Sequence, residues 1–387
     1  VDLEAVNQRV LELAAAQSAD IAERLAREQV TLLRGRGRLD GTEAVIATTE
    51  DGEQRLPADV TLIATGAHPR VLPDAVPDGE RILTWTQVYG LTELPEKLIV
   101  VGSGVTGAEF AGAYSALGSE VALVSSRDRV LPHEDADAAQ VLEDVFTRRG
   151  MQVLSRSRAQ SVARDGDQVV VTLTDGRTVT GSHCLLAVGS IPNTDALGLA
   201  EAGVELDDGG FVKVDRVSRT SARGVYAAGD CTGVLMLASV AAMQGRIAMW
   251  HALGDRVGPL DLSVVSSNVF TAPEIATVGM NQQQADTAVP KVATVTLPLE
   301  GNARAKMQGI RDGFVKVFCL PVTGIIVGGV VVAPRASELI HPLAIAVAER
   351  LTVDQLAESF TVYPSISGSL AEAARRLHLH GQELRGS

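Results

Sequence analysis

Residues 98–110 read LIVVGSGVTGAEF, and this stretch decides the fold of the chain. It opens with four aliphatic residues, as expected of a strand that is buried on both faces. Gly102, Gly104 and Gly107 then follow the spacing G-x-G-x-x-G. A helical pattern comes next, and a second aliphatic run, Val121–Val124, follows it. The stretch therefore predicts a strand, a tight turn, a helix and a second strand.

Each glycine has a separate role in such a turn. The first allows the tight turn, the second lets a pyrophosphate approach the backbone, and the third lets helix and strand pack closely. The N-terminus of the helix supplies free N–H groups and a partial positive charge. A lone glycine fingerprint is a weak signal, and a tight turn without a ligand is the alternative, but the strand–turn–helix context strengthens it. We predict a dinucleotide site here.

The residues after the second strand indicate which dinucleotide binds. Folds that bind NAD place Asp or Glu there for the ribose hydroxyls, whereas folds that bind NADP use Arg for the 2′-phosphate. This chain has Ser125, Ser126 and Arg127, with Arg129 shortly after. A missing acid removes repulsion, and a guanidinium can donate two hydrogen bonds to a phosphate. These residues favour NADP without excluding NAD; alternatively, both arginines are ordinary solvated charges.

Composition excludes several classes of protein. The chain has 387 residues, 46% of them hydrophobic, which suffices for two or three domains. Its net charge of −13 argues against a nucleic-acid partner. The longest apolar stretch, Ile325–Pro334, is too short to span a bilayer, so no integral membrane segment is expected. Cys184, Cys231 and Cys319 are far apart and have no metal-like spacing, so we expect no metal and a cytoplasmic location.

Three other buried strands end in residues that suit ligand binding. Asp59–Thr65 and His183–Val188 each lead through a small residue and a spacer to a glycine, Gly66 or Gly189. This similarity suggests two nucleotide-binding units of one plan. The third strand, Val225–Asp230, ends in an acid, and the carboxyl end of a strand is where α/β sheets bind ligands. A turn or N-cap aspartate is the simpler interpretation of that residue alone.

The chain changes character after Val264, where an α+β module without a glycine fingerprint begins. We expect antiparallel strands and then helices, with a role in catalysis or oligomerisation. The expected strands are Val269–Val278, Lys291–Leu297, Gly313–Cys319 and Ile325–Val332. The expected helices are Ala336–Arg350, Val353–Glu358 and Ser367–Leu379.

Several motifs in order carry a family resemblance. They are IATGAHPR at 63–70, VVGSGVTGAEFA at 100–111, VGSIPNT at 188–194, GVYAAGD at 224–230 and FTAPEIATVG at 270–279. Together they resemble the pyridine nucleotide–disulfide oxidoreductases, flavoproteins that include lipoamide dehydrogenase, and especially their NAD(P)H:quinone reductase branch. The resemblance implies an α/β fold with two Rossmann-like dinucleotide-binding domains and a C-terminal α+β dimerisation domain.

The resemblance also implies domain boundaries. The FAD-binding domain would comprise residues 1–93 and 191–262, the NAD(P)-binding domain residues 94–190, and the interface domain residues 263–387. The family's FAD fingerprint and redox cysteine pair would lie before Val1. We therefore expect an N-terminally truncated first domain that holds FAD poorly or not at all.

The implied cofactors are FAD and NADP, or NAD in its place. Asp230 would hydrogen-bond the ribityl chain, and Met236, Leu237 and Ala238 would open the helix that faces the flavin ring. The other implied cofactor-binding residues are Thr65, Gly66, Gly229, Gly102, Gly104, Gly107, Glu109, Gly189, Ser125, Ser126 and Arg127.

One departure from the family concerns its motif H-P-T-x-S-E, whose His is an acid/base oriented by the Glu. The matching residues run from Tyr363 to Gly368 and read YPSISG. A phenol, which ionises near pH of about 10, does not replace an imidazole near neutral pH. The resemblance thus implies a homodimeric flavoprotein that passes electrons from NAD(P)H to a quinone-like acceptor. Tyr363 of the partner would lie beside the acceptor, or would only fill the space that the imidazole leaves.

Three alternatives remain at this point. The chain could act as a dihydrolipoyl dehydrogenase or as a soluble transhydrogenase, which would change only the acceptor. It could also be an inactive fragment that keeps NADP binding and dimerisation.

Overall fold

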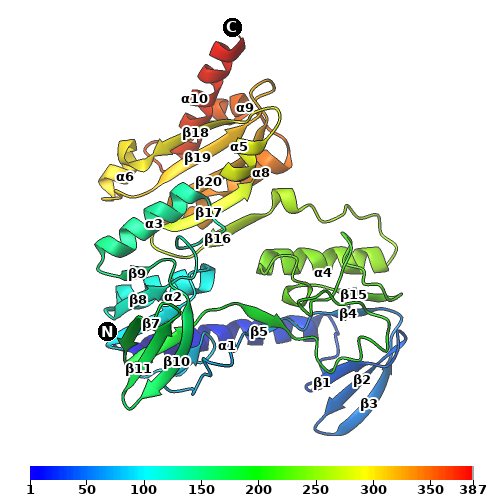
Figure 1. Ribbon diagram of the computed structural model, residues 1–387. Coiled ribbons are helices and arrows are strands. Elements are labelled where there is room, and N and C mark those ends of the chain that lie inside the picture. Colours follow the sequence, from blue (N-terminus) through cyan, green and yellow to red (C-terminus); the bar gives the residue numbers. More distant parts are fainter. Residues whose placement is uncertain (386–387) are drawn as a thin grey trace.

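The computed structural model describes residues 1–385, with side chains through His378. Figure 1 shows three parts: two lobes in the lower half and an antiparallel sheet with helices above them. One lobe is built on a five-stranded parallel sheet in the order β6-β13-β7-β8-β9. Its strands are β6 (Ile82–Thr84), β7 (Lys97–Val101), β8 (Glu120–Val124), β9 (Gln152–Leu154) and β13 (His183–Leu186). The predicted domain boundary at residue 94 falls between β6 and β7.

Successive side chains of β7 point to opposite faces of the sheet, and a different layer packs on each face. Leu98 and Val100 pack into one core cluster with the helices α2 (Val105–Leu117) and α3 (Ala136–Arg148). Ile99 and Val101 belong to a second cluster, which includes residues of the antiparallel sheet β10-β11-β12. That sheet comprises β10 (Ala159–Asp165), β11 (Gln168–Leu173) and β12 (Thr178–Gly181). Both faces of β7 are therefore buried, as its unbroken aliphatic sequence predicts.

The second lobe contains a smaller parallel arrangement, in which β4 (Thr61–Ile63) pairs with β15 (Val225–Ala227). The helix α4 (Ala238–Ala252) follows β15.

The remaining elements of residues 1–93 are α1 (Leu3–Arg27), β1 (Arg36–Leu39), β2 (Ala44–Thr49), β3 (Gly52–Pro57), β5 (Ala67–Pro69) and the 3₁₀ turn η1 (Val88–Gly90). β5 pairs antiparallel with β14 (Ser190–Pro192), so two strands run side by side between the lobes (Figure 1).

The C-terminal part is a five-stranded antiparallel sheet in the order β16-β17-β20-β19-β18. Its strands are β16 (Ser266–Val269), β17 (Glu274–Gly279), β18 (Ala293–Pro298), β19 (Phe314–Cys319) and β20 (Ile326–Ala333). The accompanying helices are α5 (Gln282–Thr287), α6 (Ala303–Met307), α7 (Ala336–Leu339), α8 (His341–Ala348), α9 (Val353–Glu358) and α10 (Gly368–Arg385). The 3₁₀ turns η2 (Asp230–Thr232), η3 (Leu262–Val264) and η4 (Leu299–Gly301) complete the fold.

Two predicted elements of this module were wrong. The single strand expected over Val269–Val278 is the end of β16, a turn and most of β17, because Pro273 has no N–H to donate to a ladder. The single helix expected over Ala336–Arg350 is two helices, α7 and α8, and Pro342 lies in the first turn of the second. Proline is tolerated at that position because the first-turn N–H groups have no partner within the helix.

A buried ion pair joins the C-terminal sheet to the larger parallel lobe. Lys316 of β19 donates to both carboxylate oxygens of Asp135, at 2.9 and 2.8 Å, and to Asp137 at 2.6 Å. The side chains of Lys316 and Asp135 are each only 1% exposed. Asp135 is also the N-cap of α3, so the lysine holds the start of that helix. Within residues 1–385, no helix is both long enough and apolar enough to cross a bilayer.

Candidate functional site

The glycine turn between β7 and α2 has the geometry that its sequence predicts. Gly102 has a φ of +111°, and a Cβ on it would lie 2.1 Å from the carbonyl oxygen of Ala187. A Cβ on Gly107 would lie 1.8 Å from the carbonyl oxygen of Gly102. Gly104 is different, because a Cβ there would point into open space. Two of the glycines thus let the backbone pack, and the third leaves room beside it.

The open side of the turn coincides with the start of α2. Gly104 is the N-cap of this helix and supplies no side chain, so the first-turn N–H groups have no side-chain acceptor. Such groups favour an anion. At its other end the helix stops at Gly118, whose φ is +113°. The turn can therefore hold the pyrophosphate of a dinucleotide.

The predicted coenzyme-binding residues in the loop after β8 differ in their exposure to solvent. Ser125 is fully buried, and its Oγ lies 2.6 Å from Oγ of Ser103 and accepts from the Arg127 backbone N–H at 3.1 Å. It therefore shapes the loop, whereas Ser126 and Arg127 are exposed and line a cavity. Arg129 does not line this cavity; its side chain is half-buried, and its Nε has no hydrogen-bond partner among the residues that the structure describes.

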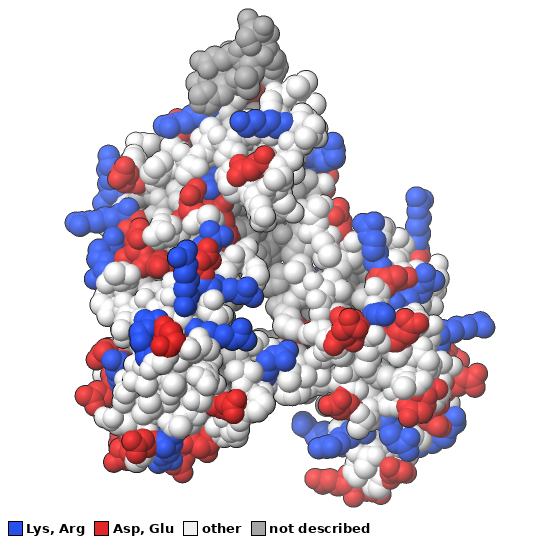
Figure 2. Space-filling view, in the orientation of Figure 1, with Lys and Arg blue, Asp and Glu red and all other residues white. Residues whose placement is uncertain are grey.

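This cavity has a volume of about 480 Å³ and lies at the carboxyl ends of β7 and β8. It is lined by Arg70, Leu72, Val101, Gly102, Val124, Ser126, Arg127, Ser157, Arg158, Ala159 and Val188. The wall contains apolar surface for a base, two serines and three arginines, and no acid. In Figure 2, Lys and Arg side chains gather on this lobe toward the hollow between the lobes. Arg70 and Arg158 were not predicted as site residues from the sequence. Arg158 lies in the loop after β9, the strand next to β8, and this position is the feature that could have indicated it.

Two other predicted residues lie beside this unit. Gly189 has a φ of +99°, is exposed, and its carbonyl oxygen accepts from the Arg70 backbone N–H at 2.9 Å. Glu109 of α2 accepts from the backbone N–H of Phe270 at 2.7 Å, which ties the helix to the C-terminal module. Burial raises the pKa of Glu109, and this hydrogen bond opposes the rise.

The carboxyl ends of the paired strands β4 and β15 form a second candidate binding edge, similar to the one at the ends of β7 and β8. β4 leads to Thr65 and Gly66, and Gly66 has a φ of +70° with open space where a Cβ would be. Thr65 donates to the Asn193 carbonyl at 2.7 Å, and the Asn193 amide donates back to the Thr65 carbonyl at 2.8 Å. β15 leads to Gly229, with a φ of +80°, and then to Asp230. Among the described residues, none hydrogen-bonds to the Asp230 carboxylate, which leaves it available to a ligand.

A buried glutamine supports this second edge, and sequence reasoning missed it. Gln244 of α4 is 1% exposed and accepts from the Gly229 backbone N–H at 2.9 Å through its Oε1. Its Nε2 lies 3.3 Å from Oγ1 of Thr232, which donates to the Gly229 carbonyl at 2.8 Å. No motif marks a glutamine in the middle of a helix, so the sequence carried no signal for it.

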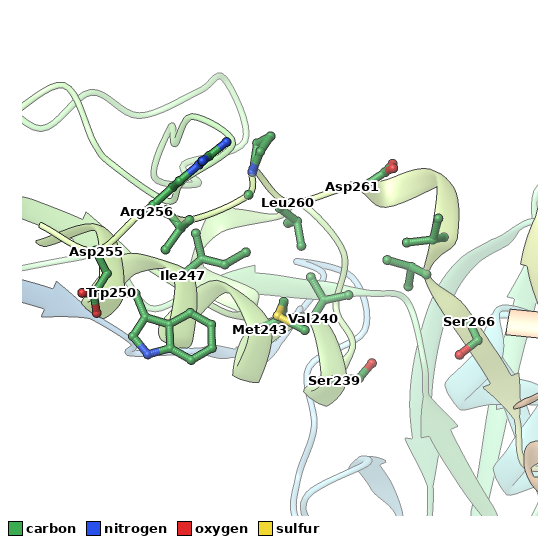
Figure 3. Close-up of a pocket in the computed structure, with 15 residues that line it drawn as sticks. Ser239, Val240, Met243, Ile247, Trp250, Asp255, Arg256, Leu260, Asp261 and Ser266 are labelled. Carbon is green, nitrogen blue, oxygen red and sulfur yellow. The ribbon is translucent and has the colours of Figure 1, made fainter. Parts of the chain in front are cut away.

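Met236, Leu237 and Ala238 lie at the start of α4, as expected. Leu237 is the N-cap and makes no side-chain cap, and Met236 is 45% exposed. Farther along the helix, Met243 and Trp250 point into a different cavity of about 750 Å³, which the chain at 255–266 closes from the other side (Figure 3). None of the predicted site residues lines that second cavity.

Tyr363 lies in the C-terminal part, away from the glycine turn. Its side chain is 85% exposed at the rim of a cavity of about 400 Å³. Asn302 holds the loop behind it by donating to the Ser365 carbonyl and to Oγ of Ser369, each at 2.9 Å. Within the part of the chain that is described, the structure brings Tyr363 to none of the other predicted residues.

The three cysteines are buried and unpaired. Burial raises the pKa of Cys184, and it raises that of Cys319 to about 11. Thiols of this kind stay protonated near neutral pH and do not act as nucleophiles. Among the described residues no group of side chains could hold a metal ion.

Comparison with known proteins decides the family. Residues 3–245 match the family model of the pyridine nucleotide-disulphide oxidoreductases, and residues 265–374 match the model of their dimerisation domain. The chain belongs to this family. The resemblance and the fold class expected from the sequence are thereby confirmed, and the pyridine nucleotide-disulphide oxidoreductases are enzymes that use a flavin and a nicotinamide dinucleotide.

Individual relatives within the family differ in activity. The chain is 57% identical to an NAD(P)H dehydrogenase (quinone) of Mycobacterium tuberculosis, over 98% of this chain and 78% of the relative. It is 32% identical to a dihydrolipoyl dehydrogenase of Zymomonas mobilis, over 96% of this chain and 81% of the relative. The solved structure of LpdA from Mycobacterium tuberculosis matches with a TM-score of 0.94 at 57% identity, over 97% of this chain and 84% of that one.

Proposed function

We propose that this flavin-dependent oxidoreductase binds NADP(H) or NAD(H) at the glycine turn and delivers the electrons to a quinone-like acceptor. The observation that carries the proposal is the intact glycine turn in a chain that is 57% identical to an NAD(P)H dehydrogenase (quinone). Gly102 and Gly107 would keep the turn tight, and Gly104 with the start of α2 would hold the pyrophosphate.

The edge formed by β4 and β15 fits a flavin. Gly66 leaves open space beside the backbone, the Asp230 carboxylate is available, and the start of α4 has no side-chain cap. Asp230 would accept from hydroxyl groups of the cofactor, and the α4 N-terminus would favour negative charge on the ring. When bound, FAD supplies the hydride acceptor and passes the electrons on.

The acceptor is proposed from what the residues can do. The loop at 363–368 has Tyr363 and Gly368 where the family motif has the His that acts as acid/base and the Glu that orients it. Tyr363, in the place of the family's acid/base, can stack on a flat acceptor and donate a hydrogen bond to a quinol oxygen. Dihydrolipoyl dehydrogenase activity is the second candidate, because relatives at 32% identity carry that name.

Two measurements on the purified chain, supplied with FAD, test this function. A bound flavin gives absorbance bands in the visible blue, and weak bands after gel filtration would agree with the poor retention of FAD expected from the sequence. Turnover is therefore measured with FAD in excess, and no turnover under that condition would contradict the flavin site. Turnover with a quinone, lipoamide and a thio-nicotinamide dinucleotide then separates the candidates. We expect the quinone to be reduced fastest, and a faster reaction with lipoamide would favour the second candidate.

We further propose that the coenzyme is NADP(H) and that Arg127 contributes to this preference. Its side chain is exposed on the cavity and has no hydrogen-bond partner among the described residues. Arg127→Glu should raise the KM for NADPH by about tenfold or more, because one charge-assisted hydrogen bond is lost and a repulsion is introduced. The KM for NADH should change little, and an equal loss for both coenzymes would overturn the assignment.

We also propose a homodimer in which Tyr363 completes the partner's acceptor site. The match to the dimerisation domain and the exposure of Phe360, Val362 and Tyr363 support this assembly. Light scattering at micromolar concentration should report a dimer. Tyr363→Phe should lower kcat/KM for the quinone several-fold and leave the bleaching of visible absorbance by NADPH unchanged. An unchanged quinone rate would leave the tyrosine with a packing role only.

A further inference from the structure

The loops that follow β8 and β9 are joined by backbone hydrogen bonds. The Ser125 N–H donates to the Leu154 carbonyl at 2.9 Å, and the Ser157 N–H donates to the Ser125 carbonyl at 2.7 Å. The Arg156 N–H donates to the carbonyl of Arg127 at 2.6 Å. Because β8 and β9 are parallel neighbours, both loops leave the same edge of the sheet. Arg127 and Arg158 therefore line one cavity although 30 other residues separate them in sequence.

The loop after β9 is held in place before any ligand binds. Ser157 is 1% exposed, and its Oγ accepts from Arg177 at 2.9 Å. The Arg158 carbonyl accepts from the Thr174 N–H at 2.9 Å, which fixes the backbone on the other side. A preorganised loop loses little entropy when its side chains bind a ligand. Arg158 is thus an exposed side chain on a fixed backbone.

The charge of this cavity is unbalanced. Among its lining residues are Arg70, Arg127 and Arg158, and no Asp or Glu. The guanidinium groups of Arg127 and Arg158 make no hydrogen bond or ion pair with any described residue. Arg70 is held by the other rim, where its Nη2 lies 3.4 Å from the Ser190 carbonyl. Two uncompensated guanidinium groups beside the turn at Gly102 suit a dianionic phosphate.

We propose that Arg158 is a second specificity-determining residue, which binds the 2′-phosphate of NADP opposite Arg127. This inference rests on the proposed function, in which the glycine turn holds the nicotinamide dinucleotide. The preference for NADP is then set by two loops. The usual sequence rule considers only the residues at the end of β8, so it does not include the cation that the loop after β9 contributes. An arginine suits this role because its fork can donate two hydrogen bonds to one phosphate.

Titration calorimetry with two adenosine fragments tests this assignment without turnover. The fragments are 2′,5′-ADP, which carries the 2′-phosphate, and 5′-AMP, which does not. Arg158→Ala should weaken binding of 2′,5′-ADP by about tenfold or more and change that of 5′-AMP less than about twofold. Arg156→Ala is the matched control, because Arg156 is exposed in the same loop but does not line the cavity. It should change neither affinity by more than about twofold, and thermal melts should show that both variants are folded.

The possible outcomes separate this inference from the proposed function. If the wild-type chain prefers 2′,5′-ADP and Arg158→Ala keeps that preference, Arg158 does not bind the phosphate and the inference fails alone. Equal losses in the Arg158 and Arg156 variants would indicate only a general effect of charge, and would also overturn it. If the wild-type chain binds neither fragment, the nucleotide site itself is wrong, and both proposals fail.

Discussion

The two parallel strand units of this chain reach the same local shape by different means. In the unit of β7, α2 and β8, a strand ends in a glycine turn that packs backbone against backbone, with Gly107 directly against the Gly102 carbonyl. In the unit of β4, β15 and α4, the strand end at Gly229 is held by the side chain of Gln244. The first unit sits in a sheet of five strands, and the second in a pair.

This difference explains why the first unit has a glycine fingerprint and the second does not. A close backbone approach excludes every side chain, so the sequence must show glycine at fixed spacing. A side-chain hydrogen bond from a helix leaves no such mark, because many spacings and residue types could supply it. The two units should therefore respond differently to substitution, and four experiments test this expectation.

The largest effect should come from Lys316→Met, which breaks the link between the first unit and the C-terminal sheet. It leaves the carboxylate of Asp135 buried without its cation, which costs about 3–5 kcal/mol. Hydrogen exchange should report a loss of protection in α3 and little change in α4. Lys213→Met is the control, because Lys213 pairs with Glu205 at 3.6 Å on the surface and should contribute less than about 1 kcal/mol. Equal effects of the two variants would contradict the prediction.

The next largest effect should separate two glycines of one turn. Gly107→Ala forces a Cβ toward a carbonyl oxygen at 1.8 Å, so the backbone must shift, and we expect a destabilisation of about 3 kcal/mol. Gly104→Ala places its Cβ in open space and should leave the melting temperature nearly unchanged. Its methyl group should instead weaken binding of 5′-AMP and NADP. Equal melting temperatures for the two variants would show that the close approach is not what requires glycine.

A smaller effect should come from Gln244→Met, which tests the side-chain support of the second unit. The substitution conserves volume but leaves the buried Gly229 N–H without its acceptor, at a cost of about 1–3 kcal/mol. Protection from hydrogen exchange should fall in α4 and not in α2. Gln283→Met, at an exposed position of α5, is the control and should be nearly neutral. A neutral Gln244→Met would mean that the glycine alone maintains this strand end.

The smallest effect concerns Glu109, whose pKa is raised by burial. A carboxyl with a raised folded-state pKa binds its proton more tightly when folded, so its ionisation destabilises the fold as pH rises through that pKa. Glu109→Gln keeps an acceptor for Phe270 and cannot ionise. Melting temperatures between pH 4 and pH 8 should therefore show the variant gaining slightly on wild type toward the alkaline end. A gain toward the acid end would give the shift the opposite sign.

The sequence by itself determined the first unit, the order of the elements and the family. β7, α2 and β8 could be predicted because buried strands, helical periodicity and glycine spacing are local properties of the chain. The positions of Gly102, Gly104 and Gly107 followed from the same rule, as did the exposed Arg127 after β8. The expected strand over Val269–Val278 was wrong because a turn at Pro273 divides the run into the end of β16 and most of β17.

Only the tertiary structure decided what surrounds these residues. Arg158 joins Arg127 because β8 and β9 are parallel neighbours, which is a property of the sheet order and not of either loop. Ser125 faces inward although Ser126 next to it faces the cavity, because successive residues at a strand end point to opposite sides. Gln244 and Lys316 reach their partners across 15 and 181 positions of sequence. Their hydrogen bonds form only when packing brings distant elements together and removes water, so no local pattern could announce them.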